Sequence, residues 1–88
     1  MIVYPLHARD NMRARGVSEQ EVEQVIAAGR PSHVRAPRLA REMLFTQGYD
    51  RKGTYYPHQL VRAIFVEEDD RMVIVTIVSY YGRWEVWS

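Results

Sequence analysis

The clearest pattern of apolar and polar positions in the chain lies at residues 19–29, where it has the period of a helix. Three apolar residues recur at i, i+3 and i+4 and so share one face: Val22, Val25 and Ile26. Ser18 and Glu21 have the spacing of a capping box, in which each side chain accepts from the other residue's backbone N–H. Gly29, with Pro31 just beyond, is expected to end the helix in the left-handed conformation.

A second, more basic helix is predicted directly before it, from Pro5 to about Arg15, with Gly16 as its end. Proline suits the first helical turn, because its missing N–H would have no partner there. Three residues are expected to pack inward: Leu6, Ala8 and Met12. Three polar residues spaced four apart share another face, with Arg13 nearby: His7, Asn11 and Arg15.

The C-terminal third predicts an antiparallel hairpin, with strands at residues 60–67 and 72–81 joined by an acidic turn. If the two ends of the turn face each other, the cross-strand pairs are Val66 with Val73, Ile64 with Val75, and Arg62 with Ile77. The alternate face then carries Phe65, Ile74, Ala63, Thr76 and Val78. Because both faces are strongly apolar, residues 72–78 are expected to form a central strand covered on both sides, or nearly so.

The middle of the chain predicts shorter elements. Residues 43–46 have strand character, and residues 32–36, between two prolines, are expected to be extended at a sheet edge. A polar, aromatic loop is predicted at residues 49–59, and a short last strand at residues 84–87. The predicted fold is a single α+β domain, residues 1–88, with two N-terminal helices packed on a four- to five-stranded antiparallel sheet.

The composition fits one small domain, because 88 residues with 47% hydrophobic content supply side chains for a single core. The chain contains no cysteine, so it lacks a disulfide framework and a thiolate metal site, and a reducing cytoplasm is the expected location. The N-terminus lacks the pattern of a signal peptide. Charges interrupt every apolar run before the ~18 residues needed to span a bilayer, so no membrane partner is expected.

The charge is nearly balanced overall, at +1, but it is unevenly distributed. Most arginines lie in residues 7–41, whereas residues 67–70 are all acidic. Arginine binds phosphate and carboxylate in a bidentate manner, so an arginine-rich face suits RNA or an acidic protein. The alternative is an ordinary solvated surface in an arginine-rich protein, and the composition alone favours that alternative.

Several residues at the start of the chain form a motif: His7-Ala8-Arg9, Met12, Arg15-Gly16-Val17-Ser18, Glu21-Val22, Ile26 and Gly29. The hairpin adds Leu60-Val61-Arg62-Ala63 and Ile74-Val75-Thr76-Ile77-Val78. Together these residues resemble a bacterial family catalogued as domain of unknown function 4258. The resemblance covers most of the chain, with a looser match over residues 30–59.

That family is regarded as similar to the small ribonuclease fold of barnase, EndoU, the colicin E5 and D nucleases and RelE toxins. Many proteins with this fold are toxins of toxin–antitoxin pairs, or toxin domains, that cleave RNA without a metal. The resemblance therefore implies two helices followed by a four-stranded antiparallel sheet, and no cofactor. It also implies a site lined by an N-terminal histidine, a strand arginine and a hydroxyl from the last strands.

Metal-independent RNA cleavage needs a base, cations that neutralise the transition state, and an acid. His7 is the candidate acid or base, since imidazole titrates near neutral pH; the alternative is a surface or capping histidine. Arg62 is the candidate phosphate clamp, because a charge inside an apolar strand needs a partner. The alternative is a structural ion pair with Glu42, Glu67 or Glu85.

The last strands supply the candidate hydroxyls. Thr76 can donate to a phosphate, although a mid-strand threonine is also simply a good strand former. In the register above, Thr76 and Arg62 lie on opposite faces, and only a bulge or an odd-length turn brings them together. Either Tyr80 or Tyr81 faces the Arg62 side, where it can stack on a base or act as an acid, or serve as an interface aromatic.

Three arginines of the first helix are candidate contacts to the RNA backbone: Arg9, Arg13 and Arg15. The alternative is a solvated face with Asp10 as a local partner. His33 and His58 lie in irregular segments, and no pair of histidines has the spacing of metal ligands, so no metal site is expected.

Two functions remain open. The first is a metal-independent endoribonuclease-like toxin, which takes RNA across the sheet beside residues 49–59 and is neutralised by an acidic antitoxin protein. The second is a non-catalytic module on the same fold that binds a protein or forms a homodimer. Its contact patch would consist of Tyr55, Tyr56, Trp84 and Trp87.

Overall fold

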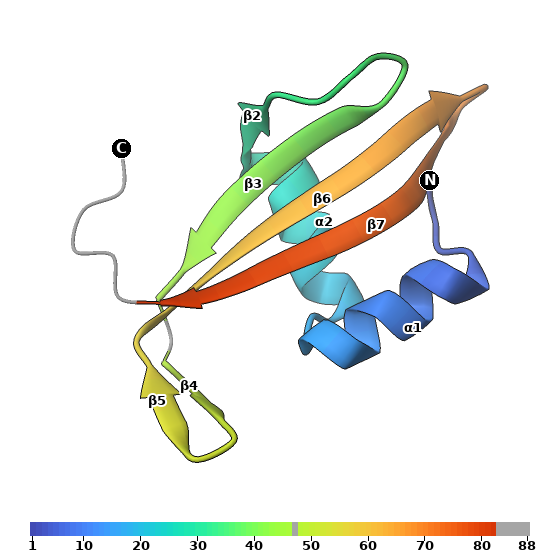
Figure 1. The fold of residues 1–88 in the computed structure, drawn as a ribbon. Helices are drawn as coiled ribbons and strands as arrows, with labels where there is room; N and C mark the ends of the chain where they lie inside the picture. Colours follow the sequence, from blue (N-terminus) through green and yellow to red (C-terminus); the bar gives the residue numbers. More distant parts are fainter. Residues whose placement is uncertain (47, 83–88) are drawn as a thin grey trace.

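The computed structural model describes residues 1–46 and 48–82 (Figure 1). In chain order the elements are β1 (Ile2–Val3), α1 (Leu6–Arg15), α2 (Glu19–Ala28), β2 (Arg30–Ser32), β3 (Leu39–Phe45), β4 (Tyr49–Arg51), β5 (Thr54–Tyr56), β6 (His58–Glu68) and β7 (Arg71–Gly82). The strand predicted at residues 84–87 lies outside the described residues. The sequence pattern did not indicate the short β1.

Five strands form one sheet in the order β1-β7-β6-β3-β2, and β4 and β5 form a separate small hairpin. The predicted α+β class, with two N-terminal helices against one sheet, is confirmed. The sheet is mixed rather than purely antiparallel, because β1 runs parallel to β7. The other neighbouring pairs in this sheet are antiparallel.

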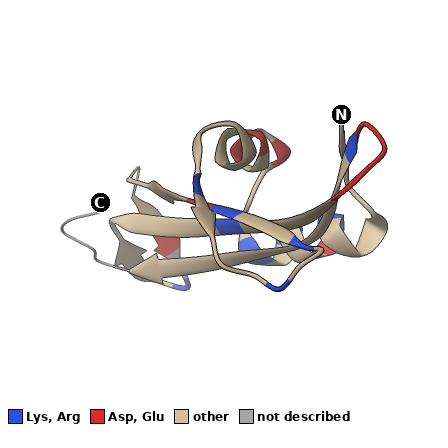
Figure 2. Ribbon diagram, turned by 90° about the horizontal axis from the view of Figure 1, so that it is seen from above, with Lys and Arg blue, Asp and Glu red and all other residues tan. Residues whose placement is uncertain are grey.

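The helices cover the sheet unequally. In Figure 1, α2 crosses behind the sheet, whereas α1 lies along the outer edge of β7. Figure 2 shows α2 on one side of the sheet and the connection between β2 and β3 bending round to the other side. We call the α2 side the covered face and the opposite side the open face. Residues 72–78 are nonetheless all buried or half-buried, as the expectation of a strand covered, or nearly so, on both sides requires.

The second helix forms for the reasons that its sequence indicates. The Ser18 hydroxyl accepts from the Glu21 N–H at 3.1 Å, and the Glu21 carboxylate accepts from the Ser18 N–H at 2.9 Å, so the predicted capping box is confirmed. Val22 and Val25 are fully buried against the sheet. Gly29, however, has φ −71° and ψ 161°, which is extended and not left-handed.

Gly29 is extended because the chain passes directly from α2 into β2. A Cβ at this position would lie 2.4 Å from the Val25 carbonyl oxygen and 2.8 Å from the Glu42 carbonyl oxygen. The glycine therefore allows the end of α2 to approach β3 closely. It does not form the left-handed helix end that the sequence predicts.

The first helix begins one residue later than predicted, with Pro5 as its N-cap, and Gly16 ends it with φ 70° as expected. Ala8 and Met12 are buried, but Leu6 is 76% exposed, so its predicted inward position is wrong. Leu6 precedes Ala8 by two residues, which at 100° per residue places it on nearly the opposite side of the helix.

The core lies between the covered face, α2 and the inner side of α1. Its buried residues are Ala8, Met12, Val17, Val22, Val25, Phe45, Val61, Ala63, Phe65, Ile74 and Ile77.

Two segments of the middle region differ from expectation. The predicted loop at residues 49–59 contains the β4–β5 hairpin and the first two residues of β6. Lys52 and Gly53 both have positive φ, at 52° and 81°, which is the two-residue turn that suits a tight hairpin. The edge strand at Pro31 comprises Arg30–Ser32, and residues 33–36, predicted as extended, continue as a connection outside the sheet.

The long hairpin of β6 and β7 contains a bulge. Val66 pairs with Val73 as predicted, but Ile64 pairs with Thr76 and not with Val75. Arg62 accordingly pairs with Val78 and not with Ile77. One extra residue in β7, at Val75, shifts the pairing beyond it and moves Thr76 and Val78 to the face that carries Arg62.

The centre of the open face is formed by three cross-strand rows from β3, β6 and β7. These rows are Ala40-Ile64-Thr76, Glu42-Arg62-Val78 and Leu44-Leu60-Tyr80. Their alternation with the core residues of the covered face is the period of two that a strand imposes. The open face therefore combines apolar side chains with a central pair of opposite charges.

We expect Gly29→Ala to lower the free energy of unfolding by about 1–3 kcal/mol, since a methyl group there meets two backbone carbonyls that belong to packed elements. Urea unfolding followed by circular dichroism measures the change. Ala28→Ser, at the exposed neighbouring position, is the control and should stay within about 0.5 kcal/mol of wild type. Equal stability of Gly29→Ala and wild type would contradict the close packing of α2 on β3.

Candidate functional site

The predicted polar face of α1 is turned towards the outer edge of β7. The His7 Nε2 atom lies 3.2 Å from the Val75 carbonyl oxygen, at the bulge. The Asn11 side-chain oxygen accepts from the Ile77 N–H at 2.6 Å and from the Thr76 hydroxyl at 3.2 Å. Side chains from one face of α1 therefore bond to the backbone of β7 along the part of its edge that β1 does not reach.

The His7 bond determines where this ring carries a proton. A carbonyl oxygen only accepts, so the Nε2 atom must donate to Val75. In the neutral ring the Nδ1 atom is then an acceptor, and in the charged ring it is a second donor. Because the side chain is exposed, Nδ1 can take or give a proton to a bound molecule.

Arg62 lies at the centre of the open face and is only partly satisfied. Its Nη2 atom donates to the His33 carbonyl, in the connection between β2 and β3. Its Nε atom is buried without a hydrogen-bond partner among the described residues. Glu42, one of the ion-pair partners considered from the sequence, is the cross-strand neighbour of Arg62 but pairs with Arg30 at 3.6 Å.

The other candidates of the last strand lie on different faces. Thr76 and Tyr80 share the open face with Arg62, and Tyr80 is 52% exposed. Tyr81 belongs to the covered face, where its hydroxyl donates to the Arg15 carbonyl at 2.9 Å. The bulge therefore brings Arg62, Thr76 and Tyr80 to one surface and leaves Tyr81 in a structural position.

His7 and Arg62 bind carbonyl groups of different elements. The His7 ring bonds to the outer edge of β7, whereas the Arg62 guanidinium leans away from β7 towards His33. Thr76 lies between the two. It directly follows Val75, to which His7 bonds, and its side chain is on the same face as Arg62. The structure thus brings the four predicted catalytic residues to one face and its edge, not to one enclosed hollow.

The arginines of α1 have local partners. Arg9 forms an ion pair with Glu19 and lies over the Tyr4 ring at 5.3 Å. Arg13 forms an ion pair with Asp10 at 3.4 Å, which is the local partner considered from the sequence as the alternative to RNA contact. Arg15 is exposed at the end of the helix, where its carbonyl anchors Tyr81.

One buried polar cluster was missed from the sequence. Gln59 is fully buried, and its Nε2 atom donates to the Ser79 hydroxyl at 2.8 Å and to the Tyr81 hydroxyl at 3.1 Å. The Tyr49 and Tyr56 rings contact the Tyr81 ring at 5.6 and 5.8 Å. This cluster joins the β4–β5 hairpin to the body. The sequence could have indicated that Gln59 is buried, because the alternation of side chains along β6 puts it on the same face as Val61.

Two hollows of the structure contain none of the four candidate catalytic residues. One, of about 200 Å³, is bounded by the ion pair of Arg9 and Glu19 together with Met12, Arg13 and Val17. The other, of about 320 Å³, lies on the covered face at the end of α2. Within residues 1–46 and 48–82, no group of three His, Cys, Asp or Glu side chains could hold a metal ion.

Two tyrosines have raised pKa values. Burial, assisted by Glu23 and Glu19, raises the pKa of Tyr4 to about 12, and Arg9 opposes this shift. Burial also raises the pKa of Tyr49, together with the neighbouring charges of Glu21 and Tyr81. Both groups are therefore neutral in the folded protein at physiological pH.

Comparisons with known proteins identify a family but no relative of established function. A family model matches residues 4–79, and its description is "Domain of unknown function (DUF4258)". Neither a curated protein nor a solved structure matches the chain. Among the described residues, no helix is long and apolar enough to cross a membrane.

We expect Asn11→Ala to lower the free energy of unfolding by about 1–3 kcal/mol, because it leaves the Ile77 N–H without its acceptor at a part-buried edge. Hydrogen exchange of the Ile77 amide should accelerate in the same variant. Asn11→Asp is the matched control, since a carboxylate accepts both bonds and should keep the amide protected. Unchanged Ile77 exchange in Asn11→Ala would contradict the proposed edge contact.

Alkaline unfolding tests the environment of Tyr4. Its pKa is higher in the folded state than its ordinary value of 10, so its contribution to stability is present below pH 10 and lost as pH rises through about 12. Wild type should therefore lose more stability than Tyr4→Phe between these two values. Urea unfolding at each pH, with tyrosinate absorbance as a parallel signal, measures the difference. Identical pH profiles for the two proteins would contradict it.

Proposed function

We propose that this chain, which belongs to the family described as domain of unknown function (DUF4258), is a small metal-independent endoribonuclease of toxin type. RNA would bind across the open face of the sheet. The observation that carries the proposal is the β7 bulge, because with it Arg62, Thr76 and Tyr80 share that face.

Each residue suits one task of metal-independent cleavage. His7, with Nε2 bound to Val75, offers Nδ1 as the acid or base at the edge of the face. Arg62 uses one of its N–H groups on His33, and its remaining guanidinium donors would hold a phosphate. Tyr80 would stack on a base. The Thr76 hydroxyl, which donates to Asn11 in the structure, would exchange that bond for one to the phosphate.

The distribution of charge favours RNA on the open side. In Figure 2 the acidic segments of α2 and of the β6–β7 turn lie on the covered side. The connection that crosses to the open side carries Arg35 and Arg38, both exposed. Repulsion from the covered side and attraction to the open side would orient an approaching polyanion. An acidic antitoxin protein would be attracted to the same arginines.

A second function is a non-catalytic module that binds a protein or a second copy through the same face. The apolar side chains that accompany the charges favour it: Leu44, Leu60 and Val78, together with the exposed Tyr80. Of the aromatic patch considered from the sequence, Tyr55 is exposed and Tyr56 packs on Tyr81. Trp84 and Trp87 lie outside the described residues.

The test is cleavage of a single-stranded RNA by purified protein, combined with growth arrest on expression. Wild type should cleave, and His7→Ala should lower the cleavage rate by about 100-fold or more, which is the usual contribution of an acid or base. Arg62→Gln should weaken cleavage strongly, whereas Arg41→Gln, a guanidinium of the covered face, should have little effect.

Tyr80→Ala should weaken RNA binding, and Leu39→Ala is its control, because that apolar side chain is also exposed but belongs to the covered face of the sheet. Intact RNA and normal growth at high expression of wild type would overturn the nuclease proposal. Concentration-dependent dimerisation lost in Tyr80→Ala, without cleavage by wild type, would favour the second function.

A further inference from the structure

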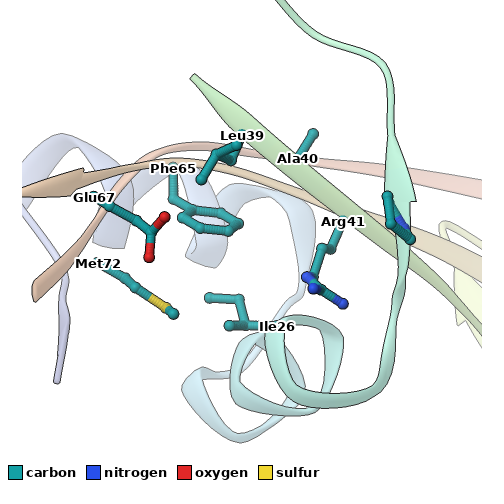
Figure 3. A pocket seen from close by; sticks show the side chains of 8 residues that line it. Ile26, Leu39, Ala40, Arg41, Phe65, Glu67 and Met72 are labelled. Atoms are coloured by element: carbon teal, nitrogen blue, oxygen red, sulfur yellow. The ribbon is translucent and has the colours of Figure 1, made fainter. Parts of the chain in front are cut away.

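A hollow of about 320 Å³ opens on the covered side of the sheet, where the end of α2 passes over β3, β6 and the start of β7 (Figure 3). Its wall includes four apolar residues: Ile26, Leu39, Phe65 and Met72. Its volume is at the low end of the roughly 300–1,000 Å³ of ligand pockets, which suits one or two side chains better than a large cofactor.

Two charged side chains border this hollow from different sides. Figure 3 shows Glu67 and Arg41 directed towards the space between Phe65 and Ile26. Arg41 is held in place, because its Nη1 atom donates to the Gly29 carbonyl at 2.9 Å. The Glu67 carboxylate, by contrast, has no hydrogen bond or ion pair within the part of the chain that the structure describes.

The hollow is acidic at the end formed by the β6–β7 turn, opposite Arg41. Glu67 begins the run of four acidic residues, 67–70, at the β6–β7 turn. Within that run Glu68 pairs with Arg71 at 4.0 Å. Figure 2 shows this turn on the same side as the acidic segments of α2. At this end of the hollow the charge of Glu67 and the acidic turn favours a cationic group.

We propose that this hollow docks a short basic segment of a partner protein, with one apolar side chain inside and a neighbouring lysine or arginine on Glu67. The apolar wall supplies the burial, and the acidic turn supplies the complementary charge. This surface lies on the opposite side of the sheet from the RNA face. Partner binding and RNA binding would therefore be compatible, and neither proposal depends on the other.

The test measures binding of three fluorescein-labelled hexapeptides to the intact protein by fluorescence anisotropy. Lys-Lys-Leu-Phe-Lys-Lys should bind, and Lys-Lys-Ser-Ser-Lys-Lys should bind at least about tenfold more weakly, because it lacks the apolar anchor. Glu-Glu-Leu-Phe-Glu-Glu should also bind at least about tenfold more weakly, because it reverses the charge.

Glu67→Lys should weaken binding of the first peptide by about tenfold or more, and Leu39→Ser, at the exposed rim, should weaken it as well. Asp50→Lys is the matched control, since it makes the same charge change at an exposed position on β4 and should have little effect.

Equal binding of the two lysine peptides, or equal weakening by Glu67→Lys and Asp50→Lys, would overturn the proposal in favour of a general electrostatic effect. Self-association that is lost in Glu67→Lys, without binding of any peptide, would overturn it in favour of a second copy as occupant. Glu67→Lys should leave RNA cleavage unchanged, so a failure of the peptide-binding proposal can be distinguished from a failure of the nuclease proposal.

Discussion

The structure depends on the contact between one face of α1 and the outer edge of β7. Beyond β1 this edge would leave backbone N–H and C=O groups unpaired. Such groups cost free energy when they are shielded from water. When they are exposed, they can pair with a strand of another chain and cause aggregation. His7 and Asn11 bond to Val75 and Ile77, and the Arg15 carbonyl accepts from Tyr81. A helix edge thus replaces a further strand, and the bulge at Val75 lies at the point of contact.

The same arrangement produces a molecule with two chemically different sides. Because α1 occupies the edge and α2 one face, the opposite face of the sheet has no helix over it (Figures 1 and 2). The bulge selects what that face presents, since it brings Thr76 and Val78 beside Arg62. The acidic turn and the acidic first turn of α2 lie on the covered side, so polyanions and basic partners would be drawn to different surfaces.

The sequence predicted the features that depend on local chemistry. The capping box of Ser18 and Glu21, the left-handed end at Gly16 and the shared face of His7 and Asn11 follow from spacing along a helix. The sequence did not indicate which element this face contacts, because the edge of β7 is more than sixty residues away along the chain. The bulge and β1 were missed for the same reason: both arise from long-range contacts that periodicity does not encode. The extended Gly29 is a third example, since only the approach of Glu42 requires it.

The proposed function requires that RNA binds to the open face, as the bulge and α1 arrange it. Amide chemical shifts of the labelled protein, titrated with a short single-stranded 2′-O-methyl oligonucleotide that resists cleavage, test it most directly. We expect the largest shift changes on β6 and β7, around Arg62, Thr76 and Tyr80. Shifts that gather on α2 and the acidic turn, or the absence of any shift at low salt, would contradict it.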